Sequence, residues 1–535
     1  MMNPADMPKS RTIPSLLAEQ GERYGDYEAL VAGDQRYTYR ELWREVRAVA
    51  KGLLATGIAP GDHVAILMGN KAEWILADLA ICSIGAVMVS VNTYVTGAEL
   101  AYILNHSDSK MLIHADRFLK YDYVEILAGL EPFADNLPKL EKFVHVGERG
   151  RAGSLSFAEL TAAGVTVTDE TLDALASAVA PDDLTALLYT SGSTSTPKGV
   201  QLVHRHLIEN MWHLGSRMHV VPGDRFWAAV SMFWALGCEN ILFNALTHAG
   251  AVVMQEYFEA GEALRLIEAE ACTIFHGSPN MAEAMLEHPD WPERDLSSLR
   301  SGACVGTPEQ IQRIVELGAT EICHVYGLTE TYGNCNLTDG KLDPRDKVHA
   351  SIGRRVEGVE QRVVDPQTLT PCKPGETGEI QVRGRVTKGY YKDQDKNEAA
   401  FTKDGFFRTG DLGSYDEDGY LYFRGRLKEL IKSGGISVSP AEVEETLMSH
   451  AGVKLAFVVP VPDPVRNEIV AALVVPSPGT DTAVLESELR KSLGETLSSY
   501  KTPRLYHFMA EENLPRTATG KVKRADIPGY FRPPG

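Results

Sequence analysis

Short apolar runs alternate with amphipathic stretches along most of this chain from Tyr37 onward. The apolar runs have the length of buried β-strands, and the stretches between them have the spacing of helices. The first examples are a strand at 63–68, a helix at 72–85, a strand at 87–91, a helix at 97–106 and a strand at 110–114. This alternation predicts an α/β fold in which helices cover parallel sheets.

The alternation continues to about residue 327 and then changes. The further strands are expected at 184–190, 226–230, 251–255, 272–277 and 321–327, with helices from about 204 and near 238–248. After Gly353 the segments become short, strand-like and separated by glycine-rich turns, which is typical of a small β subdomain.

The pattern changes again after Arg426. The last ~110 residues are enough for a small α+β domain. Its expected elements are a helix at 440–449, strands at 455–461 and 469–475, a helix at 483–498 and a strand at 504–508. We therefore expect an N-terminal domain of residues 1–425 and a C-terminal domain of residues 426–535.

The composition excludes several classes of protein. The 535 residues are 44% hydrophobic and 23% charged, which indicates more than one globular domain rather than a disordered chain. The net charge of −19 disfavours nucleic acid as a partner, because phosphates need a cationic surface. The most apolar stretch, 63–92, is interrupted by Asn70, Lys71, Glu73 and Asp78, so no membrane span is expected.

The seven cysteines are scattered, and none form a Cys-x-x-Cys motif. They therefore indicate neither a disulfide framework nor a zinc site. Reduced thiols and the lack of a basic-then-apolar leader at the N-terminus favour a cytoplasmic location.

The segment YTSGSTSTPKG at 189–199 follows a buried-strand pattern and precedes a helix. Its small residues allow backbone N–H groups to approach an anion, and its hydroxyls and Lys198 add donors and positive charge. The residues expected to contact phosphate are Thr190, Ser191, Gly192, Ser193, Thr194 and Lys198. Pro197 breaks the P-loop pattern, and a plain Ser/Thr-rich surface loop is the alternative interpretation.

With this loop in place, the chain resembles the acyl-activating, adenylate-forming (ANL) superfamily from about Tyr37 to Arg524. Four further signatures of that family follow in its order: YGLTE at 326–330, FRTGD at 407–411, GRLKELIKSGG at 425–435 and PRTATGK at 515–521. The resemblance implies a large N-terminal domain and a small mobile C-terminal domain.

The resemblance also implies a reaction, that of an AMP-forming acid–CoA ligase. A carboxylic acid and ATP, with Mg²⁺, would give acyl-AMP and pyrophosphate, and coenzyme A would then give acyl-CoA and AMP. Two alternatives stay open: a stand-alone enzyme that loads an acyl carrier protein, and a non-catalytic protein that binds a nucleotide or an acyl ligand. A luciferase-like oxidative role is a further rival. Family members are often dimers, which leaves a homodimer open.

Several residues acquire roles in nucleotide binding by resemblance. Mg²⁺ would be held near Thr190 and Glu330, and Asp411 and Arg426 would contact the ribose. Around the adenine, Tyr326 would stack, with Ser301, Gly302, Ala303, His324, Gly327 and Thr329 beside it. Without the family context, Glu330 is an ordinary exposed acid, Tyr326 a core aromatic, Asp411 a turn residue and Arg426 a surface cation.

The family performs both half-reactions in one cleft by rotating the C-terminal domain, with Lys428 at the hinge position. Lys521 would bridge the carboxylate and ATP, which places it with Thr190, Glu330 and Lys432 among the catalytic residues. After rotation, Lys432 would enter, and Gly434 and Gly435 would leave a narrow passage for the pantetheine arm. A solvated tail lysine and a plain Gly-Gly turn are the structural alternatives.

The acid pocket is also assigned by resemblance. Its expected residues are Trp234, Asn240, His276, Gly302, Cys304, Gly327 and Thr331. Trp234 replaces a histidine that is frequent in the family, and it or His276 would otherwise be a core residue. No acidic or basic residue obviously pairs with an amino or second carboxylate group, so an acid with an apolar chain, an aryl or an alicyclic group is favoured. A bulky polycyclic or quaternary-ammonium acid stays open. Ser195 and Arg355 depart from the family pattern.

Overall fold

The chain divides into two units in the computed structural model, which describes residues 6–190, 197–433, 436–463, 467–497, 501–517 and 520–531. The first unit comprises Met1–Gln361 and Val382–Phe407, and the second comprises Arg362–Gln381 and Arg408–Gly535. The β subdomain expected after Gly353 is thus shared between the units. The predicted division into an N-terminal domain, 1–425, and a mobile C-terminal domain, 426–535, stays a prediction.

The first unit contains a nine-stranded sheet in the order β18-β17-β16-β15-β14-β12-β13-β1-β2. Its strands are β1 Glu28–Ala32, β2 Gln35–Thr38, β12 Arg225–Ala228, β13 Ala251–Met254, β14 Ile274–His276, β15 Ser301–Cys304, β16 Glu321–Tyr326, β17 Asn336–Leu337 and β18 Arg354–Arg355. The strands from β1 through β16 in this order are parallel neighbours, and antiparallel strands close the sheet at both edges.

The second sheet of this unit has seven strands in the order β11-β10-β4-β3-β5-β8-β9. They are β3 His63–Leu67, β4 Val87–Ser90, β5 Ser109–Ala115, β8 Lys142–Val146, β9 Leu155–Ser156, β10 Leu184–Thr190 and β11 Lys198–Val203. All neighbours are parallel except β10 and β11. The sequence pattern does not predict β11. Because β11 is present, the segment from 189 to 199 joins two antiparallel strands before the next helix begins. A separate small hairpin pairs β6 (Arg117–Phe118) with β7 (Tyr121–Asp122).

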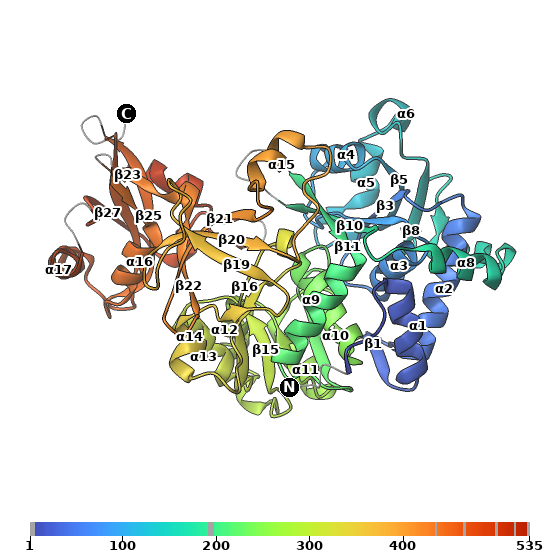
Figure 1. The fold of residues 1–535 in the computed structure, drawn as a ribbon, viewed down its shortest axis with the longest axis horizontal. Helices are drawn as coiled ribbons and strands as arrows, with labels where there is room; N and C mark the ends of the chain where they lie inside the picture. Colours follow the sequence, from blue (N-terminus) through green and yellow to red (C-terminus); the bar gives the residue numbers. More distant parts are fainter. Residues whose placement is uncertain are drawn as a thin grey trace. The chain divides into compact units, whose positions relative to one another are not determined.

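Helices cover these sheets, as the alternation predicted (Figure 1). The α-helices of the first unit are α1 Ile13–Arg23, α2 Tyr39–Ala55, α3 Ala72–Ser83, α4 Gly97–His106, α5 Tyr123–Ala128, α6 Phe133–Asn136, α7 Phe157–Ala163, α8 Asp169–Ala178, α9 His204–Arg217, α10 Leu242–His248, α11 Ala260–Ala269, α12 Pro279–Leu286, α13 Pro308–Glu316, α14 Arg345–Ala350 and α15 Gln394–Ala400. Local signals start several of them; a capping box between Thr38 and Glu41 begins α2. By contrast, α3 is apolar and buried on nearly all sides, as in the core of a large domain.

The helix predicted at 238–248 begins with an irregular turn. A π-helical turn, η3, spans Leu236–Ile241 and continues into α10. π-Helical turns are uncommon and frequently occur at functional sites. Glu239 and Asn240 both lie in this turn, so its geometry determines where their side chains point.

The second unit contains most of the remaining strands. A four-stranded sheet, in the order β19-β20-β21-β22, occurs where the chain passes between the units. Its strands are β19 Glu360–Val364, β20 Gly378–Arg383, β21 Phe407–Tyr415 and β22 Leu421–Arg426. The following sheet has the order β24-β23-β26-β25, with β27 beside β26. Its elements are β23 Ile431–Ser433, β24 Ile436–Val438, α16 Pro440–Met448, β25 Val453–Asp463, β26 Asn467–Pro476, α17 Thr482–Thr496 and β27 Leu505–Phe508. The order from α16 to β27 is the predicted one, and β23 and β24 come in addition.

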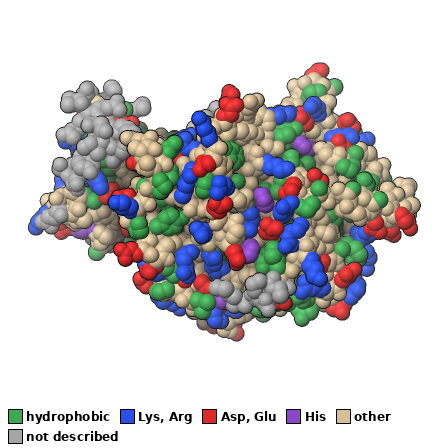
Figure 2. All heavy atoms as spheres, in the orientation of Figure 1, with side chains coloured by type: hydrophobic (Ala, Val, Ile, Leu, Met, Phe, Trp, Pro, Cys, Tyr) green, Lys and Arg blue, Asp and Glu red, His purple; other side chains and the backbone are tan. Residues whose placement is uncertain are grey.

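Three further properties bear on the predicted class of protein. No helix of the described residues is long and apolar enough to cross a membrane. All seven cysteines are free thiols. On the face drawn in Figure 2, acidic and basic side chains are interspersed.

Candidate functional site

The ends of the expected phosphate loop are held together by the β10–β11 hairpin. Thr190 lies directly opposite Lys198 in the antiparallel ladder. Opposite residues in such a ladder have Cα atoms about 4.5–5.5 Å apart. The loop residues between them, Ser191, Gly192, Ser193 and Thr194 together with Ser195, lie outside the described residues. The hairpin therefore places a hydroxyl and an ammonium group at the two ends of the predicted loop.

Tyr390 connects Lys198 to Glu330. The Lys198 Nζ lies 4.5 Å from the centre of the Tyr390 ring, a cation–π distance. The Tyr390 hydroxyl donates a hydrogen bond to Glu330 Oε1 at 2.8 Å. Burial and the Glu330 carboxylate raise the pKa of Tyr390, which keeps its hydroxyl protonated as a donor. Sequence reasoning missed Tyr390, because a tyrosine before a helix carries no local signal of these contacts.

Glu330 lies on a short turn, η5 (Thr329–Thr331), that is fixed by the backbone. The Thr387 N–H donates to the Glu330 carbonyl at 2.7 Å. The Glu330 side chain is half-buried, so its carboxylate keeps access to solvent. Mg²⁺ prefers oxygen ligands and, with nucleotides, binds one or two protein groups plus phosphates and water. The Glu330 carboxylate and the Thr190 hydroxyl suit such a site, and the described residues contain no cluster of three metal-ligating side chains.

Two glycines of the next loop allow a close approach to Asn240. A Cβ atom on Gly327 would lie 1.9 Å from the Gly333 carbonyl oxygen, and one on Gly333 would lie 2.3 Å from Asn240 Oδ1. Gly333 also has φ +76°, which favours glycine. The Thr331 hydroxyl donates to the Leu328 carbonyl at 3.0 Å. Thr331 thus shapes the loop, while Gly327 lets the loop pack against Asn240.

The expected adenine residues lie on two neighbouring parallel strands. In the register of β15 and β16, Ala303 is opposite Cys323, and Cys304 is opposite His324. The Gly306 N–H donates to His324 Nε2 at 3.4 Å. Burial lowers the pKa of His324 to about 4, so the ring is neutral at pH 7. This side chain can therefore orient a ligand by hydrogen bonding without adding charge.

The other expected site residues on β15 and β16 pack within the protein. A Cβ atom on Gly302 would lie 1.9 Å from the Phe275 carbonyl oxygen, so packing of adjacent strands alone requires glycine there. The Ser301 hydroxyl donates to the Met218 carbonyl at 2.9 Å. Tyr326 is 7% exposed at the end of β16. Burial raises the pKa of Cys304 to about 12, so it stays a neutral thiol.

His276 and Trp234, both expected in the acid pocket, differ in burial and in their contacts. His276 is completely buried at the end of β14, opposite Ala303, and neither ring nitrogen has a partner among the described residues. Burial lowers its pKa to about 3. A buried unpartnered imidazole is costly unless a ligand satisfies it. Trp234 is half-buried, and its ring lies 5.1 Å from that of Phe233 in an edge-to-face arrangement.

In the second unit, the two predicted ribose residues form a pair. Asp411 on β21 lies opposite Arg426 on β22. Arg426 Nε is 3.2 Å from Asp411 Oδ1, and the side chains are 56% and 3% exposed, respectively. Lys428, the predicted hinge residue, is exposed on the short turn η6 (Leu427–Glu429).

Lys521 is exposed on a tight turn near the end of the second unit. The Thr517 N–H donates to the Lys521 carbonyl at 2.7 Å, and the Lys521 N–H donates to Thr517 Oγ1 at 3.1 Å. Three residues later, Arg524 makes two hydrogen bonds to Glu444 on α16, at 2.6 and 2.8 Å. The backbone next to Lys521 is therefore anchored to a helix.

Two predicted features of the second unit are only partly described. The Lys432 backbone pairs with Ser437 between β23 and β24. Gly434 and Gly435 lie outside the described residues. Arg355, which departs from the family pattern, has an exposed side chain on β18 in the first unit, and its carbonyl accepts from Arg217 at 3.1 Å.

The chain matches two family models. The AMP-binding enzyme family matches residues 17–391, and the AMP-binding enzyme C-terminal domain matches residues 442–521. Three of the five motifs, at 189–199, 326–330 and 515–521, lie within these matches.

Relatives and solved structures extend this likeness over almost the whole chain. An acyl-CoA ligase of Aspergillus fumigatus is 32% identical, over 96% of this chain and 90% of the relative. A Mycobacterium tuberculosis CoA ligase for a propanoyl group on a methyl-dioxo-octahydro-indenyl ring is 34% identical, over 97% of this chain and 98% of the relative. The crystal structure of an anthranilate CoA ligase with anthranoyl-AMP has a TM-score of 0.83 at 27% identity, covering 99% of this chain and 98% of that one. The chain therefore belongs to the AMP-binding enzyme family, as an adenylate-forming acyl-CoA ligase.

Proposed function

We propose that the residues described above carry out the two half-reactions of an AMP-forming acid–CoA ligase. In the first, a carboxylate oxygen attacks the α-phosphorus of ATP, and pyrophosphate leaves with the electrons of the broken P–O bond. In the second, the CoA thiol attacks the acyl carbon, loses its proton, and displaces AMP. The observation that supports this proposal best is the set of contacts that connects Thr190, Lys198, Tyr390 and Glu330.

In this proposal, the first unit neutralises the polyphosphate. Lys198 supplies a positive charge, and the loop from Thr190 onward supplies donors to the β- and γ-phosphates. Mg²⁺, held near Glu330 and Thr190, would reduce the charge repulsion that opposes attack on ATP. Tyr390 positions both charged side chains from one ring, so the spacing between the ammonium and carboxylate groups is set before ATP binds.

The adenine would lie against Tyr326 and the strand segment Ser301–Ala303, with His324, Gly327 and Thr329 beside it. The carboxylic acid would bind among Trp234, Asn240, His276, Gly302, Cys304, Gly327 and Thr331. Two observations support the acid pocket: the buried His276 nitrogens lack partners in the described part of the chain, and the Asn240 amide packs against the loop at Gly333. Both groups can donate to a polar atom of the bound acid or of its adenylate.

The second unit would supply the remaining groups. Asp411 would accept from both ribose hydroxyls, and Arg426, already paired with it, would add a donor. Lys521 would stabilise the charge that develops between carboxylate and phosphate. Rotation of residues 426–535 about Lys428 would then exchange Lys521 for the segment from Lys432 to Gly435, where Gly434 and Gly435 admit the pantetheine arm.

For the acid itself, we propose an aryl or alicyclic compound. The sequence suggests an acid without a second charge, and the names of two similar proteins specify acids with rings, an indenyl propanoate and anthranilate. CoA is the acceptor in this proposal, and an acyl carrier protein in its place is the alternative. A cytoplasmic location and a homodimer remain proposals from the sequence.

The test is pyrophosphate release with MgATP over a panel of short, medium, long, aryl and alicyclic acids, each with and without CoA. The proposal predicts release that depends on the acid, together with acyl-CoA formation that depends on CoA. Release that CoA does not affect, with accumulation of acyl-AMP, would favour the carrier-protein alternative. No release with any acid would contradict the proposed function and favour a binding protein.

A further inference from the structure

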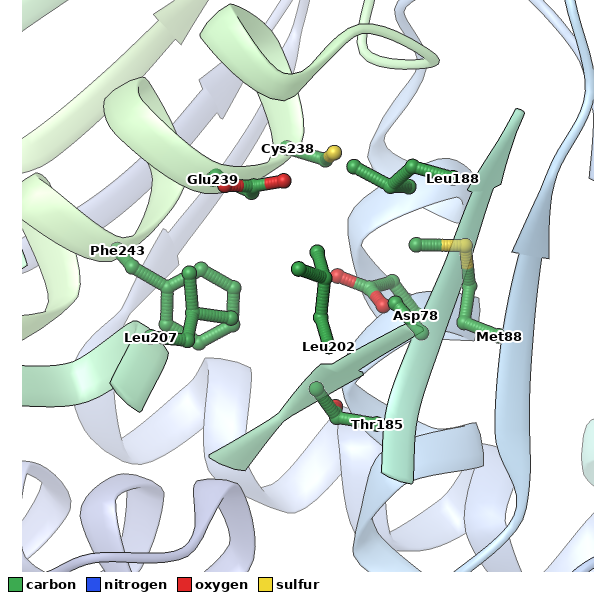
Figure 3. Close-up of a pocket in the computed structure, with 10 residues that line it drawn as sticks. Asp78, Met88, Thr185, Leu188, Leu202, Leu207, Cys238, Glu239 and Phe243 are labelled. Atoms are coloured by element: carbon green, nitrogen blue, oxygen red, sulfur yellow. The ribbon is translucent and has the colours of Figure 1, made fainter. Parts of the chain in front are cut away.

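A small cavity lies inside the first unit, between the seven-stranded sheet and the π-helical turn η3. It has a volume of about 10 Å³, roughly the room that one water molecule needs. Most of its wall is apolar, from Met88, Leu188, Leu202, Leu207 and Phe243. Two carboxyl groups, those of Glu239 and Asp78, interrupt this apolar wall and point into the space between them (Figure 3).

Glu239 is the unusual group in this wall. It is 1% exposed, and neither of its carboxyl oxygens has a hydrogen-bond partner among the described residues. Burial and, secondarily, the Glu330 carboxylate raise its pKa well above the usual value, which favours the protonated form. Leaving a buried carboxyl without partners costs stability, and such groups are rare in folded proteins. This arrangement suggests that a ligand supplies the missing hydrogen bond.

Asp78 faces the cavity from α3 on the other side. It is 3% exposed, and its carboxylate accepts a weak hydrogen bond from the Cys82 thiol, at 3.7 Å. The same thiol lies 3.0 Å from the Thr185 hydroxyl. Burial raises the pKa of Asp78 to about 7. Near neutral pH the cavity can therefore offer both a hydrogen-bond donor and an acceptor to one small polar group.

The cavity is close to the proposed acid pocket along the chain and in space. Glu239 directly precedes Asn240, which packs against Gly333 in the loop that begins at Gly327. Leu188, in the cavity wall, comes two residues before Thr190 on β10. The negative charge of Glu330 acts on Glu239 directly. A ring or chain that enters beside Asn240 therefore comes next to Glu239 in the same turn.

We propose that the cavity is the inner end of the acid-binding pocket, where Glu239 selects acids whose ring or chain carries a hydroxyl or carbonyl oxygen. The inference rests on the proposed function, because it assigns part of the substrate of that reaction. The cavity volume matches a single oxygen atom, and the apolar wall excludes larger polar groups. A neutral oxygen suits a protonated Glu239, which can donate to it.

The expected selectivity follows from the buried carboxyl. A pocket built to hydrogen-bond a substrate oxygen discriminates strongly against the analogue that lacks it, because the buried group is then left unpaired. We expect kcat/KM for an oxygen-bearing acid to exceed that of its deoxygenated analogue by about tenfold or more. An apolar pocket of the same shape would show the opposite preference.

The experiment compares matched acids on variants of the full-length enzyme. Aryl- and alicyclic-propanoic acids are paired with their ring-hydroxy, ring-oxo and ring-amino derivatives, and kcat/KM is measured by pyrophosphate release. The variants are Glu239→Met, which removes hydrogen bonding, and Glu239→Gln, which keeps it. Glu287→Met, at the exposed end of α12, is the control. Thermal unfolding of each variant shows that it folds.

The inference predicts that the wild type and Glu239→Gln prefer the hydroxy or oxo acid, and that Glu239→Met loses this preference by about tenfold. It also predicts that Glu239→Met unfolds at the same temperature as the wild type or a higher one, because an unpartnered buried polar group is removed. An equal preference in the wild type and Glu239→Met would overturn the inference. A preference of the wild type for the ring-amino derivatives would overturn it too. Failure of pyrophosphate release with every acid would overturn the proposed function as well.

Discussion

The two units of this enzyme hold their polar groups in opposite ways. In the first unit, Glu239, His276 and His324 are buried, and burial shifts their pKa values towards the neutral forms. In the second unit, Lys521 is exposed on a turn, and Arg426 is 56% exposed while it pairs with Asp411. The first unit thus relies on desolvation and packing, and the second on ion pairs and turn geometry.

This difference fits the division of labour that we propose. Groups that recognise an acid or an adenine gain strength and selectivity from a dry environment, where each hydrogen bond counts for more. A lysine that must enter and leave the reaction centre benefits from staying hydrated between steps, because no desolvation cost accompanies each exchange. Variants in each unit should therefore fail in different ways.

Loss of Lys521 should have the largest effect. We expect Lys521→Ala to reduce formation of acyl-AMP by about 10²–10³-fold, because one preorganised charge at the reacting phosphate is removed. The second half-reaction, measured with synthetic acyl-AMP and CoA, should stay within a few-fold of the wild type. Lys523→Ala, an exposed lysine two residues away, is the matched control. Equal losses in both half-reactions would contradict a role limited to adenylation.

The anchor of the Lys521 turn should matter next. Arg524→Met removes the cation that pairs with the buried Glu444 carboxylate and leaves it the Val458 N–H as a donor, which should destabilise the second unit by about 3 kcal/mol. Hydrogen exchange in α16 and β25 should then accelerate about 100-fold. Arg516→Met removes a more exposed pair, with Glu511 at 3.3 Å, and should change stability by less than about 1 kcal/mol.

Tryptophan fluorescence makes this second test specific. All six tryptophans lie in the first unit, at positions 43, 74, 212, 227, 234 and 291. The fluorescence transition in urea should therefore be unchanged in Arg524→Met. A shift of that transition as large as the change in hydrogen exchange would mean that the two units unfold together.

Within the first unit, Tyr390→Phe should have a moderate effect. It removes the hydroxyl that donates to Glu330 but keeps the ring beneath Lys198. We expect the KM for MgATP to rise about tenfold, as for loss of one hydrogen bond to a charged group. Tyr391→Phe is the control, because its hydroxyl donates to Asp108 instead, at 3.1 Å. An unchanged KM in Tyr390→Phe would separate Tyr390 from the nucleotide site.

The stability of the first unit should also depend on pH. Burial lowers the pKa of five histidines of the first unit to about 3 or 4: His204, His213, His248, His276 and His324. Between these values and the ordinary value of about 6.5, the unfolded chain binds more protons than the folded one, so stability falls as pH falls. Asp78 and Glu239 have raised pKa values and act in the opposite direction, but they are fewer.

We therefore expect the tryptophan transition to move to lower urea concentration from pH 6.5 to pH 4.5. His276→Phe should reduce this dependence by roughly 1 kcal/mol per pH unit, and it should not change the dependence between pH 7 and pH 8. The same pH slope in His276→Phe and in the wild type would show that His276 is not buried in the neutral form.

Much of the fold was predictable because its signals are local. Strands such as β3 and β10 are apolar runs, and α2 begins at a capping box that spans four residues. By contrast, β11 begins with a charged and a small residue, and β15 consists of small residues. Both segments are strands because of their neighbours in the sheets. The Ser-Gly-Ala-Cys sequence of β15 has no β-branched residue, and close packing of Gly302 against Phe275 determines its conformation.

The candidate site shows the same limit. Motifs locate Thr190, Lys198, Glu330, Asp411 and Lys521 because each lies in a short characteristic sequence. Tyr390 was missed, because its contact with Glu330 joins residues 60 positions apart. Glu239 was missed because an acid between Cys238 and Asn240 resembles a surface residue of a helix, and only the π-helical turn points it inward.

The most direct test of the central claim uses the acid that the panel identifies, labelled with ¹⁸O in its carboxylate. If the carboxylate attacks the α-phosphorus, one labelled oxygen stays on phosphorus when the CoA thiol displaces AMP. Mass spectrometry should then find one ¹⁸O in each AMP and none in pyrophosphate. Label in pyrophosphate or inorganic phosphate, or unlabelled AMP beside acyl-CoA, would contradict activation through an acyl adenylate.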